Sequence, residues 1–273
     1  TMKTKLINGI SEIQSKYDAF FIDLWGVVHN GIKLNSGAIE VLNNLHKLNK
    51  RFVFMSNAPR PSKNVQNFLL KLNMEEKLVK NIFTSGEASI KILKKKTYGK
   101  SFYHLGPERD RDLFKGFEKN ETKLENADFI LCTGFLEKRK DSLTSYKLLL
   151  KKYTHLKLIC TNPDLIVHRG LKKKYCAGKI AEIFIKLGGK AIYFGKPYPE
   201  IYKLCIKKKE KILVIGDNIR TDIKGANNMK LDSLFITHGV HKKEFLSLGI
   251  KNYDKVFKRY GAKTNYFQKK LTW

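Results

Sequence analysis

The stretch Phe20-Phe21-Ile22-Asp23-Leu24-Trp25-Gly26-Val27-Val28 decides the fold. Its apolar run is short, rich in aromatic and β-branched side chains, and ends at a glycine, which predicts a buried strand rather than a helix. Open α/β sheets bind their ligands in the crevice at the carboxyl ends of the strands, so a carboxylate at this point indicates chemistry. Asp23 is therefore the first candidate for a reactive side chain. The alternative is that Asp23 caps the turn after the strand.

The composition is that of a globular protein with a substantial core. The chain has 273 residues, of which 42% are hydrophobic, enough for one large domain or two moderate ones. No apolar run approaches the roughly 18 residues of a membrane span, so no membrane partner is expected. The four cysteines, Cys132, Cys160, Cys176 and Cys205, stand far apart without a CxxC pair. This usage is typical of reduced structural thiols and predicts a cytoplasmic protein.

The charge is strongly positive. Lys and Arg number 54 against 25 Asp and Glu, a net charge of +29, which raises the question of nucleic-acid binding. Sequence-reading interfaces depend on Arg, whose planar fork pairs bidentately with phosphate and guanine. Here Lys supplies most of the charge and is spread evenly along the chain, which favours the codon bias of an AT-rich genome. Nucleic acid is therefore not the expected partner, although the field attracts small anions.

A strand–helix–strand unit begins with the first strand. Apolar residues recur at helical spacing over 35–49, and 52–55 then has the pattern of a second buried strand. Such a βαβ unit places its two strands in parallel with a right-handed crossover. The second strand ends in Ser56-Asn57, which we therefore expect beside Asp23.

Two later strands also end in polar residues. Residues 211–215 have the pattern of a buried parallel strand and run into Gly216-Asp217-Asn218-Ile219-Arg220-Thr221-Asp222. The strand at 234–237 ends in the turn Thr237-His238-Gly239. Four strands with polar ends predict an active site rather than a scaffold.

A second α/β unit interrupts this series. Strand patterns at 102–106, 129–134 and 156–160, with a helix over 142–152, separate the second core strand from the third. The expected fold is α/β, with a doubly wound, Rossmann-like parallel-sheet core and an inserted α/β domain. The predicted boundaries are 1–97 and 192–273 for the core and 98–191 for the insertion.

The polar residues form a coherent chemical set. Asp23, Asp217 and Asp222 would repel one another, and a hard divalent cation such as Mg²⁺ is the natural neutraliser of oxygen ligands. A phosphoryl group fits between such a cation, Lys196 and backbone N–H groups, and Ser56 adds a hydroxyl. Taken singly, Lys196 could be one solvated lysine among many, and the later pair of aspartates could stabilise a helix start.

These residues, in this order, resemble the haloacid dehalogenase superfamily. Four blocks carry the resemblance: Asp23-Leu24-Trp25-Gly26-Val27, Ser56-Asn57, Gly195-Lys196-Pro197 and Gly216-Asp217-Asn218-Ile219-Arg220-Thr221-Asp222. The insertion, with Thr161-Asn162-Pro163-Asp164 near its end, is similar to the cap of the class IIA branch. That branch includes nucleotide, 4-nitrophenyl phosphate and pyridoxal phosphate phosphatases. The resemblance covers about residues 17 to 242.

The resemblance implies a role for each site residue. Asp23 would be the nucleophile, and Mg²⁺ would be held by Asp23, by the backbone carbonyl of Trp25 and by Asp217, with Asp222 acting from outside the direct ligands. Ser56 and Lys196 would bind the phosphoryl oxygens. The residues implied in substrate binding are Gly26, Asn57, Asn162 and Asp164. The implied substrate is a small phosphorylated metabolite, and a homodimer is compatible with the resemblance.

One position departs from the family pattern. Phosphatases of this superfamily carry a second Asp two residues after the nucleophile, where it protonates the leaving oxygen, and this chain has Trp25 there. An indole cannot transfer a proton near neutral pH. General acid–base catalysis contributes roughly 10²–10⁴-fold, so we expect slow turnover of substrates that need leaving-group protonation. Two histidines are hypotheses at this stage: His29 as a substitute acid, and His168 as a residue facing the substrate.

Three interpretations remain. The first is a Mg²⁺-dependent phosphatase of low activity that works through an aspartyl-phosphate on Asp23. The second is a catalytically impaired relative that binds a phosphorylated metabolite or a partner protein, with Trp25 filling the space of the attacking water. A metal-free dehalogenase is disfavoured, because Asp217 and Asp222 would be costly without a cation.

Overall fold

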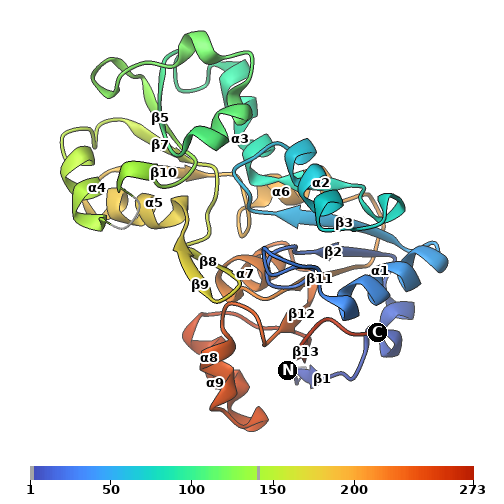
Figure 1. Ribbon diagram of the computed structural model, residues 1–273. Coiled ribbons are helices and arrows are strands. Elements are labelled where there is room, and N and C mark those ends of the chain that lie inside the picture. The colour runs from blue at the N-terminus through green and yellow to red at the C-terminus, as the bar shows by residue number, and fades with distance from the viewer. Residues whose placement is uncertain (1–2, 140–141) are drawn as a thin grey trace.

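The computed structural model describes residues 3–139 and 142–273, so residues 1, 2, 140 and 141 of the predicted domains lie outside it. The chain forms two parts, each built around its own sheet (Figure 1). The strands are β1 (Lys5–Leu6), β2 (Ala19–Ile22), β3 (Arg51–Ser56), β4 (Ile82–Thr84), β5 (Phe102–Leu105), β6 (Phe129–Cys132), β7 (Lys157–Cys160), β8 (Ile166–Arg169), β9 (Lys172–Tyr175), β10 (Lys190–Tyr193), β11 (Ile212–Gly216), β12 (Asp232–Ile236) and β13 (Tyr266–Gln268). The α-helices are α1 (Ser36–Lys47), α2 (Ser62–Lys71), α3 (Ser85–Lys95), α4 (Leu143–Leu150), α5 (Ala177–Lys186), α6 (Pro199–Cys205), α7 (Lys224–Asn228), α8 (Lys242–Leu246) and α9 (Tyr253–Arg259).

The larger sheet has seven strands in the order β1-β13-β12-β11-β2-β3-β4, and every neighbouring pair is parallel. Side chains of β2 alternate between its two faces, as the period of a strand requires. Phe20 and Ile22 pack with α1 and α2, whereas Phe21 packs with Ile201 of α6 and Ala226 of α7. Helices therefore cover both faces, which confirms the doubly wound α/β core (Figure 1).

The strand register brings the polar strand ends together. Ile22 of β2 pairs with Ile215 of β11 on one side and with Phe54 of β3 on the other. The next residues along these strands are Asp23, Gly216-Asp217 and Met55-Ser56. The predicted site residues therefore share one edge of the sheet.

The smaller part is an inserted α/β unit, called the cap below and comprising β5 to β10 with α4 and α5. Its main sheet has the order β10-β7-β6-β5, again with parallel neighbours. The sheet continues through Tyr193, two residues beyond the predicted boundary at 191, because β10 pairs with β7. The apolar pattern at 191–194 does not distinguish the two sheets, since both consist of parallel strands. The domain limits themselves stay a prediction.

A separate antiparallel hairpin, β8–β9, leaves the cap and lies toward the core (Figure 1). The hairpin was not predicted, because Lys172–Tyr175 is exposed and lacks an apolar alternation. The basic C-terminal tail packs on the core: Phe257 and Phe267 are buried, with Tyr253 and Tyr260 against them. The four cysteines are free and buried. Within residues 3–139 and 142–273, no helix has both the length and the apolar character of a membrane span.

Candidate active site

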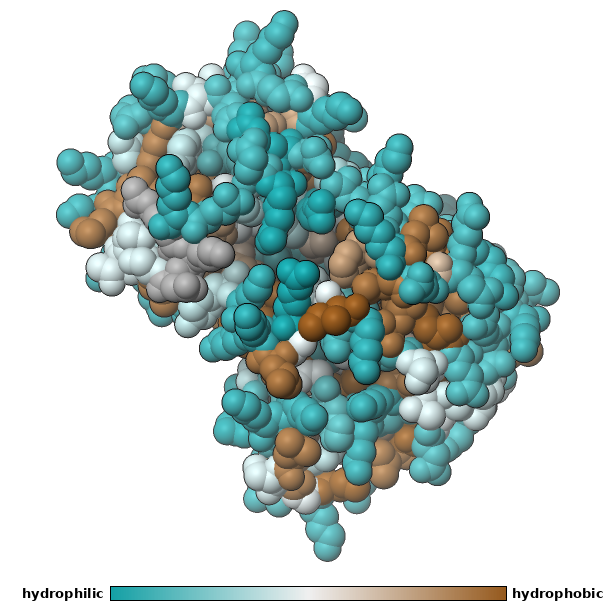
Figure 2. Space-filling view, viewed as in Figure 1, coloured by the Kyte–Doolittle hydropathy of each residue, from teal (hydrophilic) through white to brown (hydrophobic). Residues whose placement is uncertain are grey.

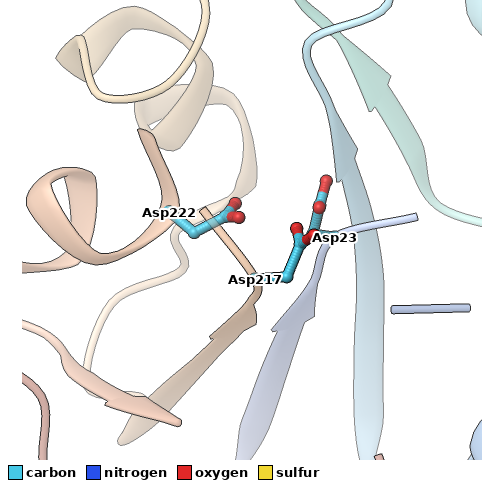
Figure 3. A group of neighbouring side chains, drawn as sticks. All are labelled: Asp23, Asp217 and Asp222. Carbon is cyan, nitrogen blue, oxygen red and sulfur yellow. The ribbon is translucent and has the colours of Figure 1, made fainter. Parts of the chain in front are cut away.

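Three carboxylates meet at the carboxyl edge of the large sheet. Asp23 follows β2, Asp217 follows β11, and Asp222 lies in the short helical turn Ile219–Ile223. Their oxygens come within 4.8 Å of one another. Figure 3 shows Asp222 reaching toward Asp23 and Asp217 from that turn. The sequence therefore predicted this cluster correctly as a spatial group.

Lys196 joins the cluster from the loop before α6. Its Nζ donates hydrogen bonds to Asp23 Oδ1 at 2.8 Å, to Asp222 Oδ1 at 2.7 Å and to the Met55 carbonyl oxygen at 2.8 Å. All three ammonium protons are thus engaged. Lys196 and Asp222 side chains are 3% and 1% exposed, whereas that of Asp23 is 13% exposed. Asp23 is therefore the member of this ion-pair network that solvent or a ligand reaches.

The charges of this group are unequal. Burial raises the pKa of the Asp23 carboxyl, an effect that Lys196 partly offsets. Burial, followed by repulsion from Asp23, raises the pKa of Asp217 well above its usual range and that of Asp222 to about 6. Burial alone would lower the pKa of Lys196, but Asp222 and Asp23 outweigh it and raise that pKa. One ammonium thus faces three crowded carboxylates, a donor set suited to a hard divalent cation.

Two glycines allow the backbone to close around Asp217. A Cβ on Gly26 or on Gly239 would lie 2.1 Å from Asp217 Oδ2. That oxygen also accepts a hydrogen bond from the Val240 N–H at 2.8 Å. Gly26 has a φ of +90°, which L side chains rarely adopt. Gly26 is therefore required for close approach to the carboxylate. The prediction named the turn that contains Gly239 but gave neither Gly239 nor Val240 a role.

Asn57 connects the core to the cap. Its Oδ1 accepts from the Lys196 backbone N–H at 2.8 Å, and its Nδ2 donates to the Lys196 carbonyl at 2.9 Å and to Asp164 Oδ1 at 3.0 Å. Asn162 Oδ1 in turn accepts from the Asp164 N–H at 3.1 Å. Burial raises the pKa of Asp164 to about 6. The cap residues named from the sequence therefore reach the edge of the carboxylate cluster.

Ser56 ends β3 beside this network. Its Oγ accepts a hydrogen bond from the Ala58 N–H at 3.1 Å, which leaves the hydroxyl proton available as a donor. Ser85 Oγ is buried without a hydrogen-bond partner among the described residues and lies where a Cβ on Gly195 would contact it. No sequence pattern marked Ser85, since it opens an ordinary amphipathic helix.

Trp25 contacts the cap hairpin. Its Nε1–H donates to the His168 carbonyl oxygen at 2.5 Å, and its ring stacks on Phe68 with centroids 6.5 Å apart. His29 packs edge-on against both rings and is 2% exposed. Burial lowers the pKa of His29 to about 4, and its Nδ1 accepts from the Gly31 N–H. His29 is thus a neutral core residue, and the hypothesis of a substitute acid at His29 finds no support in this geometry.

Two models of known protein families match segments of this chain. A family model described as haloacid dehalogenase-like hydrolase matches residues 20–118, and a second, described as HAD-hydrolase-like, matches residues 193–261. The first matched segment contains Asp23 and Ser56, and the second contains Lys196 and both later aspartates. The two matches thus cover the site from both sides of the cap.

Full-length relatives are similar over most of the chain. The chain is 26% identical to the 5'-nucleotidase YutF of Bacillus subtilis, covering 85% of this chain and 91% of that protein. It is 24% identical to the 4-nitrophenylphosphatase of Schizosaccharomyces pombe, covering 85% and 88% of the two chains. A haloacid dehalogenase-like family hydrolase from Brucella suis superposes with a TM-score of 0.85 at 28% identity, covering 98% of this chain and all of that one.

Proposed function

This chain belongs to the haloacid dehalogenase superfamily of hydrolases, class IIA, and we propose that it is a Mg²⁺-dependent phosphatase acting through an aspartyl-phosphate on Asp23. The observation that carries the proposal is the shared lysine. Lys196 fixes Asp23 Oδ1 and is itself buried, while the Asp23 side chain stays partly exposed. A substrate can therefore reach Asp23, and a phosphoryl group next to it lies near a fixed positive charge.

The residues that would hold Mg²⁺ are Asp23, Asp217 and the backbone carbonyl of Trp25, with Asp222 outside the direct ligands. The fit rests on charge, because three carboxylates lie within 4.8 Å of one another and Lys196 pairs with two of them, Asp23 and Asp222. A bound divalent cation would balance the remaining negative charge and polarise the phosphoryl oxygens.

The chemistry of the chain's own residues follows in two displacements. Asp23 attacks phosphorus through a carboxylate oxygen, the ester oxygen leaves with its bonding electrons, and the equatorial oxygens are stabilised by the nearby charge of Lys196 and by a hydrogen bond from Ser56. Water then attacks the aspartyl-phosphate and releases inorganic phosphate and the Asp23 carboxylate. Asn57 holds the Lys196 backbone on both sides, which fixes the lysine during both steps.

The substrate we propose is a small phosphorylated metabolite rather than nucleic acid, with Gly26, Asn57, Asn162 and Asp164 around it. Trp25 cannot protonate the leaving oxygen. Substrates with good leaving groups, aryl and acyl phosphates, are therefore favoured over alkyl phosphates.

A second candidate is a binding protein on the same scaffold. The observation that favours it is the engagement of Trp25, whose single polar hydrogen is donated to the cap at the position where relatives carry an acid. Such a protein would bind a phosphorylated metabolite at the Lys196 site and turn it over little or not at all.

The deciding experiment measures release of phosphate and of p-nitrophenol with Mg²⁺, across aryl, acyl, sugar and nucleotide phosphates. Asp23→Asn and EDTA should each abolish release. Asp18→Asn is the matched control, because Asp18 is an exposed aspartate at the opposite end of β2 and should leave release unchanged. If no substrate gives Asp23-dependent release, the phosphatase proposal fails and the binding protein stands.

A further inference from the structure

The loop after β2 and the cap hairpin are joined at three points. Trp25 Nε1 donates to the His168 carbonyl at 2.5 Å, and the Gly170 N–H donates to the Asn30 carbonyl at 3.0 Å. At the third point Ile32 lies against Gly170, where an added Cβ would come within 2.6 Å of the isoleucine Cδ1. Core and cap therefore meet through the segment that begins two residues after Asp23.

The indole is fixed on the core side. Phe68 of α2 lies parallel to it, with 7° between the ring planes, and the His29 ring packs on its edge. A Cβ on Gly31 would come within 2.5 Å of Trp25 Cζ2, so the backbone itself closes against the ring. The direction of the Trp25 N–H is thus determined by the core before the hairpin contacts it.

The hairpin is small, and one of its strands is exposed. It consists of two four-residue strands, a size that is marginal in isolation, and β9 is exposed along its whole length. Asp164 lies two residues before β8, and the Cys176 N–H closes the base of the hairpin on the Leu165 carbonyl at 2.9 Å. Figure 2 shows hydrophobic side chains gathered at the waist between the two parts of the molecule. Whatever holds the hairpin also holds the Asp164 segment at the site.

We infer that Trp25 is a positioning residue, whose indole N–H docks the β8–β9 hairpin on the core and so sets the cap over Asp23. The position that carries an acid in related phosphatases would then serve cap placement in this chain. The docking is inferred from the contacts alone, whereas its effect on turnover rests on the proposed phosphatase function.

Limited trypsin digestion tests the docking without any substrate. The hairpin offers cleavage sites at Arg169, Lys172 and Lys173, and cleavage follows the undocked population when docking is fast. Trp25→Phe keeps a ring on Phe68 but removes the N–H. Because one hydrogen bond shifts such an equilibrium by roughly five-fold, hairpin cleavage should be about five-fold faster. Equal cleavage of Trp25→Phe and the native chain would overturn the inference.

A second variant perturbs the same contact from the cap. Gly170→Ala at φ +61° places a methyl group against Ile32 and should also accelerate cleavage. Gly261→Ala is the matched control, since its φ is +62° and a Cβ there contacts nothing within 4 Å. Equal acceleration by both alanines would assign the effect to backbone strain and refute docking. Thermal melting of each variant identifies any that is globally unfolded.

Enzyme kinetics tests the effect of Trp25 on turnover. With p-nitrophenyl phosphate, whose leaving group needs little protonation, Trp25→Phe should raise KM about five-fold and change kcat less than two-fold. A fall in kcat with constant KM would instead make the indole part of the chemical step and contradict a positioning role. Absence of any Asp23-dependent turnover would fail the phosphatase proposal, and the trypsin result would still decide the docking.

Discussion

Replacing Lys196 by Met should destabilise the fold strongly. The ammonium is 3% exposed and donates to two carboxylates and one carbonyl at 2.7–2.8 Å. Met fills a similar volume but leaves Asp222 and Asp23 buried without a counter-charge. Removing one partner of a buried ion pair costs about 3–5 kcal/mol. For a chain of this size, that loss lowers the melting temperature by about 10 °C.

The assay is urea unfolding in EDTA at neutral pH, comparing free energies of unfolding. Lys186→Met is the matched control, because that lysine also bonds a carboxylate, at 3.3 Å from Glu182, but its side chain is 74% exposed. An exposed pair contributes at most about 1 kcal/mol. Adding Asp222→Asn to Lys196→Met should recover part of the loss, since it removes the carboxylate that the lysine neutralised. A loss for Lys196→Met no larger than that of Lys186→Met would refute the reasoning.

Three other predictions follow from single features. The native protein should favour p-nitrophenyl phosphate over a sugar phosphate by roughly 100-fold or more in kcat/KM, because Trp25 supplies no proton to the leaving oxygen. Similar kcat/KM values for the two substrates would show that another group supplies this proton. Gly239→Ala should raise the Mg²⁺ concentration for half-maximal activity by about 10-fold or more, because its Cβ displaces the Asp217 carboxylate, and Gly249→Ala, with open space around it, should not. Burial raises the pKa of Asp110 to about 6 in the folded protein, above its usual value of 3.8. The protonated carboxyl therefore stabilises the folded protein below about pH 3.8, and this stabilisation is lost as the pH rises through about 6. Asp110→Asn should therefore gain up to about 2–3 kcal/mol of unfolding free energy relative to the native protein between pH 4 and pH 8, and a difference independent of pH would contradict this.

The sequence predicted the core because its strands are short apolar runs with polar ends. β3, β11 and β12 fall within two residues of their predicted ranges, and β2 occupies the first part of the stretch 20–28. Parallel pairing then brings Asp23 and Asp217 to one edge. The strand pattern did not locate Lys196, since no local pattern marks a buried lysine among many exposed ones. Lys196 was identified through the Gly195-Lys196-Pro197 block of the family resemblance.

Contacts between segments that are distant in the chain could not be predicted from the sequence. The hairpin at β8–β9 has no apolar alternation, because its position depends on Trp25 and Asn30 more than on its own packing. The burial of His29 was missed for a related reason: Phe68, which covers it, lies on a helix about 40 residues away. The short strand β13 was missed because three residues at a sheet edge carry little pattern.

The strand order also has a consequence during protein synthesis. β2 lies between β3 and β11, yet β2 ends at Ile22 and β11 at Gly216, so 216 − 22 = 194 residues must be made before the second neighbour is complete. At about 5–20 residues per second this takes roughly 10–40 s. Throughout that interval one edge of an all-apolar strand has no partner on the ribosome, which exposes it to aggregation. A nascent chain of this fold is therefore a natural client for chaperones that shield unpaired strands until the last third of the protein emerges.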